Sequence, residues 1–287
     1  MNKVNLLENL TYPVLLVTSM IVLHIIGGTI QLDISSKDAQ RDFNTAIGTS
    51  LLSGAFLLSI RVIQKSVAKH LLLILDVTNR RHSFWVHRRT LSERFKMHLI
   101  WSATLGFIMP ILYMVTEGVI SRINQKEVFI VAVGAIPFWL LMSLYIFQIT
   151  TVNRHLRKFL NTEGMELIVK IKMYQSVMTV AAITIATILL VFLIMPVFWM
   201  NLSIHLFDMV FISSLCLFLT LLLVSPLINY YRKLRKAKQS LASDLDKRIE
   251  CLIKESVTSE RSKEIEYLLG LKEKYCNSNF TACIDKG

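Results

Sequence analysis

Six long apolar runs, separated by polar segments, dominate the first 231 residues of the chain. They cover residues 12–32, 45–62, 99–119, 128–150, 177–200 and 206–228. Each has at least about 17 residues and almost no charge, which is enough for a helix to cross about 30 Å of hydrocarbon. Backbone groups find no water in lipid and the runs lack strict alternation, so helices rather than a barrel are expected. The pattern predicts an all-α polytopic membrane protein, whose transmembrane domain over residues 1–231 has six helices.

The pattern changes after residue 231, where charged residues dominate and leucines recur at helical spacing. The first such stretch contains Leu234, Leu241 and Leu245, and the second, near residues 260–274, contains Leu268 and Leu271. Polar residues separate the two stretches, which predicts a helical hairpin over residues 232–275 and a loose tail over residues 276–287. The stretches have too few turns for a sustained coiled coil.

Small residues and prolines lie within the predicted spans. The small residues are Ala46, Gly48, Ser50 and Gly54 in the second run and Ala182 and Ala186 in the fifth. Such faces allow another helix to approach closely, either from the same chain or from a second copy. Pro110, Pro137 and Pro196 predict kinks in the third, fourth and fifth helices.

Composition agrees with a membrane protein. The chain is 53% hydrophobic and 18% charged, with a mean hydropathy of +0.52, whereas soluble domains average about 45 to 50% apolar and about 25% charged residues. The net charge of +12 is compatible with nucleic-acid binding. The basic residues cluster at the ends of apolar runs, however, where membrane insertion and anionic lipid explain them more simply. We therefore expect anionic lipids of the cytoplasmic leaflet as partners, and no nucleic acid.

The 32 lysines and arginines orient the chain. Nine of them lie between residues 61 and 98, around a predicted basic loop at 63–98. If the N-terminus is cytoplasmic, 28 basic residues lie inside and four outside. The positive-inside rule then predicts that both termini and the hairpin are cytoplasmic, in a multi-pass protein of a bacterial-type inner membrane. The apolar residues 71–77 cover only about 10 Å as a helix, so we expect them to extend the second helix or to lie at the interface.

The region after the last span resembles part of a known group of proteins. The two segments are KAKQSLASDLDKRIECLIKE, residues 236–255, and EIEYLLGLKEKYCN, residues 264–277. They resemble the cytoplasmic end of a broad group of bacterial multispanning inner-membrane proteins, which close with a similar leucine-rich helical pair. The tryptophan-proline-phenylalanine ending of that group is missing, and only Phe280 could replace it. The group has no activity to carry over to this chain.

Motifs of catalysis and cofactor binding are missing from the sequence. It contains no phosphate-binding G-x-x-x-x-G-K-[ST], no G-x-S-x-G, no H-E-x-x-H and no G-x-G-x-x-G. His82 and His87 are five residues apart without a nearby cysteine, and the four cysteines show no paired spacing. We therefore expect no metal, no cofactor and no enzyme activity, although a lipid-modifying enzyme built from scattered residues stays open.

Polar residues within and at the ends of the spans are candidates for a pore or for helix interfaces. His24 is the one ionisable side chain near the middle of a span, and Thr184 and Thr187 offer hydroxyls in the fifth run. Intramembrane ionisable groups carry a functional hypothesis by default, but a neutral histidine can also bond to a neighbouring helix. Three further residues could form an outer mouth: Glu117, His205 and Asp208.

The basic loop supplies a second candidate site. Its members are Arg80, Arg81, Trp85, Arg88 and Arg89. Aromatic rings mixed with basic side chains suit the headgroup layer, so we favour a juxtamembrane lipid anchor over a ligand site.

Two functions follow from these patterns. The first is an oligomeric protein, expected to be a homo-oligomer, that forms or regulates a permeation path under control of its cytoplasmic tail. Low buried charge disfavours a coupled transporter but leaves a pore open. The alternative is a non-conducting scaffold or signalling subunit that presents the basic loop and helical tail to a cytoplasmic protein partner.

Overall fold

The computed structural model describes residues 3–30, 36–116, 119–160, 166–202, 206–254 and 259–277, and this part of the chain is helical apart from short turns, with no strand. The α-helices are α1 (Lys3–Ile26), α2 (Lys37–Val77), α3 (Phe84–Thr116), α4 (Lys126–Leu160), α5 (Leu167–Ile194), α6 (Leu206–Lys254) and α7 (Ser259–Lys272). Short 3₁₀ turns are η1 (Arg81–Ser83), η2 (Val119–Arg122) and η3 (Met195–Trp199), and a π-helical turn, η4 (Glu273–Asn277), follows α7.

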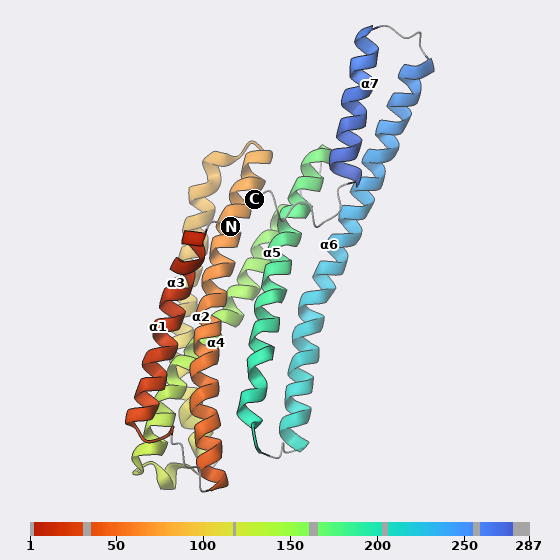
Figure 1. Ribbon diagram of the computed structural model, residues 1–287. Helices are drawn as coiled ribbons and strands as arrows, with labels where there is room; N and C mark the ends of the chain where they lie inside the picture. Colours follow the sequence, from red (N-terminus) through yellow and green to blue (C-terminus); the bar gives the residue numbers. More distant parts are fainter. Residues whose placement is uncertain are drawn as a thin grey trace.

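The helices α1 to α6 run side by side in alternating directions (Figure 1). The connection between α2 and α3, the start of α1 and the second half of α6 lie toward one end of the bundle, which we call the basic end. Five of these helices, α1 to α5, are long and apolar enough to cross a membrane. The sixth predicted span, residues 206–228, forms the first half of α6 and stays a prediction.

Helix α2 is the central helix of the bundle. It begins after Ser36, whose side chain accepts a hydrogen bond from the backbone N–H of Ala39. In the most apolar 18-residue stretch of α2, 67% of the residues are buried, compared with 17% in the corresponding stretches of α1 and α3. The outer faces of α1 and α3 therefore expose large apolar side chains, as lipid-facing helices do.

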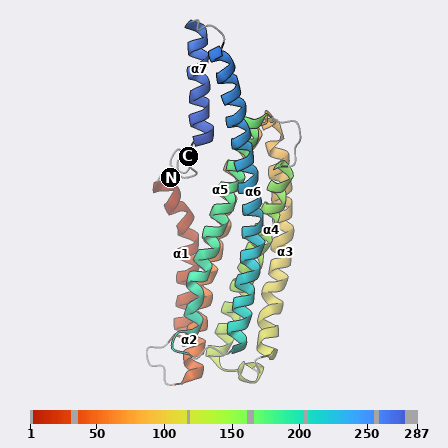
Figure 2. The ribbon, with the colours of Figure 1, turned by 90° about the vertical axis from the view of Figure 1, so that its right-hand side faces the viewer.

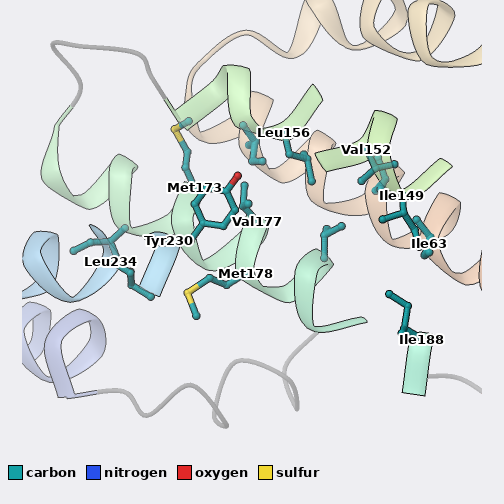
Figure 3. Close-up of a cluster of buried hydrophobic side chains, with 14 of the residues drawn as sticks. Ile63, Ile149, Val152, Leu156, Met173, Val177, Met178, Ile188, Tyr230 and Leu234 are labelled. Atoms are coloured by element: carbon teal, nitrogen blue, oxygen red, sulfur yellow. The ribbon is translucent and has the colours of Figure 1, made fainter. Parts of the chain in front are cut away.

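One apolar core joins α2, α4, α5 and α6. Figure 3 shows Ile63 of α2 beside Ile149 and Val152 of α4, with Val177 of α5 and Tyr230 of α6 in the same cluster. All five side chains are buried. The core continues past the predicted spans toward the basic end, so the helices pack together beyond the apolar windows.

The small residues of α2 pack against other parts of the same chain. A Cβ atom at Gly54 would lie 2.3 Å from Cγ2 of Val17 on α1, and one at Gly48 would lie 2.8 Å from the ring of Phe198 in η3. The hydroxyl of Ser50 donates a hydrogen bond of 2.6 Å to the carbonyl of Ala46, so its hydrogen-bond partner lies within α2 itself. These contacts settle that this face of α2 serves packing within the chain.

Helix α1 ends at Ile26, earlier than the first predicted span, which extends to residue 32. Gly28 has a positive φ of 79°, and the backbone N–H groups of Thr29 and Ile30 donate to the carbonyl of His24. Such a turn closes a helix C-terminus. The apolar sequence continues past Gly27 and Gly28, but the helix ends at Ile26.

The three prolines that predicted kinks differ in their positions within the helices. Pro110 and Pro137 lie inside α3 and α4, which continue through them as α-helices, whereas α5 changes to the 3₁₀ turn η3 beside Pro196. The side chain of Asn44 on α2 donates to the carbonyls of Phe198 and Met200, at 3.3 and 2.7 Å. It thereby satisfies carbonyl groups that the end of the helix leaves free.

The predicted basic loop is a helical hairpin. Helix α2 continues through residues 71–77, and α3 begins only seven residues after Val77. Leu71, Ile74 and Leu75 are buried in the bundle. Of the two locations left open for residues 71–77, the structure shows the extension of the second helix.

The chain ends in a second hairpin, formed by the latter half of α6 and by α7 (Figure 2). The facing leucines, Leu241 and Leu245 on α6 and Leu268 on α7, are buried. An ion pair of 3.5 Å joins Arg248 to Glu264 across the hairpin. Of the predicted loose tail, residues 278–287 lie outside the described residues.

Candidate functional site

The tip of the α2–α3 hairpin is built by a tight reversal of the backbone. After α2, the N–H of Thr78 donates to the carbonyl of Ile74 and that of Arg80 donates to the carbonyl of Leu75. Asn79 adopts a positive φ of 57°, a conformation that asparagine tolerates better than most residues. The reversal brings the end of α2 and the start of α3 together at one surface.

Six exposed side chains on this surface form what we call the tip patch: Arg80, Arg81, Trp85, Val86, Arg88 and Arg89. Trp85 is 68% exposed and Val86 64% exposed, so the centre of the patch is apolar. The Arg88 guanidinium lies over the Trp85 ring, 5.2 Å from its centroid. The partly buried ring of Phe84 meets the Trp85 ring edge-on, with centroids 5.9 Å apart.

Two of the four arginines in the tip patch have carboxylate partners. Arg81 pairs with Asp76 at 3.5 Å, and Arg89 pairs with Glu93 at 2.9 Å. Arg80 and Arg88 have no carboxylate partner within the described part of the chain. The tip patch therefore carries uncompensated positive charge beside an exposed indole.

The tip patch lies far along α2 from Arg61, the first charged residue after the uncharged residues 43–60. The Arg61 guanidinium stacks on the Tyr12 ring of α1 at 4.5 Å, and this pair marks the first charge after the apolar stretch. Val77 follows Arg61 by 16 residues, a rise of about 24 Å. The headgroup layer of a bilayer is only about 5 to 8 Å thick on each side.

No protein-family model, curated protein or solved structure matches this chain significantly.

The hydroxyl candidates Thr184 and Thr187 are buried inside the bundle. The Thr187 hydroxyl shares a hydrogen bond of 2.9 Å with that of Tyr145 on α4 and donates to the carbonyl of Thr184 at 2.7 Å. The Thr184 hydroxyl donates to the carbonyl of Val180. Both side chains thus find partners within one copy of the chain, Thr184 within α5 and Thr187 both within α5 and across to α4.

His24 is fully buried between α1 and α4. Its ring lies against Gly134, where a Cβ atom would be only 2.7 Å from Nε2. Neither ring nitrogen has a hydrogen-bond partner among the described residues. Gly134 therefore makes room for the imidazole, because it has no side chain. Near the same end of α1, the Lys126 ammonium donates to the carbonyl of Ile26 at 3.1 Å.

The proposed outer mouth is described only in part. Glu117 and His205 lie outside the described residues, and Asp208 lies in the first turn of α6. The α3–α4 and α5–α6 connections lie at the same end of the bundle. The mouth hypothesis stays a prediction.

The structure adds contacts that local sequence spacing could not suggest. His87 pairs with His155 of α4, with ring centroids 5.4 Å apart, rather than with His82. Tyr145 is a buried hydrogen-bond partner from an otherwise apolar run. No group of three or more histidine, cysteine, aspartate or glutamate side chains in the described ranges is arranged to hold a metal ion.

The end of the second hairpin returns to the bundle. Tyr275 in η4 is 9% exposed, and the ammonium of Lys172, on α5, lies 5.7 Å from the centre of its ring. A further ion pair joins Lys272 to Asp246 within the hairpin. The second hairpin is therefore held at its base as well as along its length.

Proposed function

We propose that this protein is a non-conducting membrane scaffold or signalling subunit, which presents two helical hairpins to a soluble partner. In this proposal six helices span the inner membrane, and both hairpins and both termini are cytoplasmic. The distribution of basic residues, 28 on that side and four on the other, supports the orientation. No catalytic step is part of the proposal.

The reach of the α2–α3 hairpin carries the proposal. A connection that only joins two spans at the membrane surface can be short, but α2 continues for 16 residues after Arg61. Its buried face is packed there by residues of α4 and α5, including Leu156 and Ile171. The packing makes the extension a firm support for the exposed tip patch.

The filled interior of the bundle favours a scaffold over a path through one copy. Leu52, Ile63 and Val180 are fully buried at the contacts between α2, α4 and α5. The hydroxyls of Thr184 and Thr187 are satisfied within the chain. A water-filled path through this part of the described interior would have to displace these side chains.

A permeation path between copies is the second proposal. Ala186 is exposed on α5, and Ala182 on the same face is only half-buried, so the described part of the chain does not cover this smooth face. Small residues on an uncovered face allow a second copy to approach closely. Ion flux across the membrane of proteoliposomes that contain the protein, lost when Ala186 is substituted, would support this second function.

Site-specific photo-crosslinking in cells tests the scaffold proposal. A benzophenone side chain is placed at Val86 in the tip patch, at Tyr267 on α7, or at Leu193 on the exposed apolar face of α5. The proposal predicts adducts with a second protein at Val86 or Tyr267 and none at Leu193. Adducts only at Leu193, only with a second copy, would contradict it and favour the path between copies.

A further inference from the structure

The tip patch combines three properties that together indicate its ligand. It is positively charged without compensation at two arginines, it has an exposed aromatic and aliphatic centre, and it stands on a rigid support. Tryptophan and arginine are the residues most enriched in the energetically dominant parts of protein interfaces. Contiguous exposed apolar surface rimmed by polar residues marks interaction sites when it is large, and Trp85 and Val86 are adjacent here.

The position of the tip patch argues against lipid as the ligand. Along α3, Trp85 precedes residue 99, the start of the predicted span, by 14 residues, which is about 21 Å of helix. Along α2 the corresponding rise is about 24 Å. Both values exceed the thickness of one headgroup layer, about 5 to 8 Å. A tilt of about 20° shortens them by less than a tenth, so the arginines stand beyond the headgroups.

The charges around the tip patch also argue against a nucleic acid. A polyanion needs a continuous basic track for successive phosphates. Here Asp76 and Glu93 interrupt the positive surface beside Arg81 and Arg89. A peptide can place its few carboxylates on Arg80 and Arg88 and an apolar side chain against Trp85, while avoiding the two resident carboxylates.

We infer that the tip patch binds an acidic segment of a soluble protein, with carboxylates on Arg80 and Arg88 and an apolar side chain against Trp85. The inference rests on the proposed scaffold function and names the chemistry of one of its partners. Planar guanidinium groups bind carboxylates through paired hydrogen bonds. Electrostatic attraction of this kind mainly speeds association and sets the choice of partner.

A binding experiment with the full chain tests this inference. The protein is placed in nanodiscs of phosphatidylcholine alone, so that no anionic lipid competes for the arginines. The probe is a short fluorescein-labelled peptide that contains aspartates, glutamates and one central leucine. Its counterpart carries asparagine and glutamine in place of the acids, and binding is followed by fluorescence anisotropy at low and high salt.

The variants separate the charge from the apolar centre. Arg80→Glu with Arg88→Glu is expected to weaken binding of the acidic peptide by at least about tenfold, and Trp85→Ala by several-fold. Trp85→Phe is expected to restore part of the loss. The matched control, Lys233→Glu with Lys236→Glu, makes the same change of net charge at two exposed positions of α6 and is expected to leave binding unchanged.

Four results would overturn the inference. They are no binding of the acidic peptide at millimolar concentration, equal losses in the matched control, displacement of the peptide by single-stranded RNA at lower concentrations than by unlabelled peptide, and loss of peptide binding when phosphatidylserine is added to the nanodisc. The last two would assign the patch to nucleic acid and to lipid, respectively. Crosslinks at Tyr267 without binding at the tip patch would leave the scaffold proposal standing and refute only this inference.

Discussion

Replacing Gly54 by alanine tests the contact that holds α1 against the central helix. A Cβ atom at this position would lie 2.3 Å from Cγ2 of Val17 and 3.4 Å from the carbonyl oxygen of Pro13. Valine is stiff at χ1, so its methyl group cannot swing away easily, and the two helices must separate. Overpacking of this kind costs about 1 to 3 kcal/mol.

A matched control removes the effect of helix propensity from this measurement. Alanine in place of a mid-helix glycine favours the helix by about 0.5 to 1 kcal/mol. Gly270 lies in α7 with nothing within 4 Å of a Cβ atom, so Gly270→Ala should show only this gain. The difference in the free energy of unfolding between the two variants therefore isolates the steric cost, about 1 to 3 kcal/mol.

Denaturant unfolding in detergent micelles, followed by circular dichroism, provides the assay. Combining Gly54→Ala with Val17→Ala removes the clashing methyl group, and the two changes should be non-additive by about 1 to 3 kcal/mol. If Gly54→Ala stabilises the protein as much as Gly270→Ala does, α1 does not lie against α2 as described.

Three further predictions concern buried polar side chains and use the same unfolding assay. Tyr145→Phe should lower the free energy of unfolding by about 0.5 to 1.5 kcal/mol, because it removes the 2.9 Å bond to Thr187; an unchanged value would contradict that bond. Asn44→Leu should cost about 1 to 3 kcal/mol, since the carbonyl of Met200 loses its 2.7 Å donor, and a neutral result would mean that water replaces the amide. His24→Leu should leave stability unchanged or raise it by up to about 1 kcal/mol, because neither ring nitrogen has a described partner. A clear destabilisation would instead reveal a group bound to the imidazole.

Much of the helical architecture follows from the sequence because membrane helices carry their information locally. Apolar runs of sufficient length predicted the apolar parts of α2 to α5 but not the continuation of α2 and α3 into the predicted loop 63–98, and leucine spacing predicted a helix in the region of α7. The end of α1 was misplaced because hydropathy continues through Gly27 and Gly28, whereas the backbone turns there. Apolar content alone does not report a positive φ.

The candidate site was less predictable because it depends on contacts between distant residues. The sequence singled out Trp85 and its neighbouring arginines and favoured the headgroup layer for them, which stays a prediction. The structure adds that α2 continues as one helix for 16 residues past Arg61, and our proposal that the tip patch stands beyond the headgroups rests on this continuation. The partners of Thr187 and His87, namely Tyr145 and His155, come from another helix, and one sequence offers no signal for such pairs.

The height of the tip patch above the bilayer is the central claim, and tryptophan quenching measures it directly. A variant that keeps Trp85 and carries phenylalanine at the other three tryptophans, Trp101, Trp139 and Trp199, is placed in bilayers with either brominated or headgroup-spin-labelled lipids. A second variant keeps only Trp101, which is exposed on α3 within the predicted span. We expect water-soluble acrylamide, and neither lipid quencher, to quench Trp85, and brominated lipid to quench Trp101. Quenching of Trp85 by the lipid probes as strongly as Trp101 would place the tip patch in the membrane surface and contradict the account.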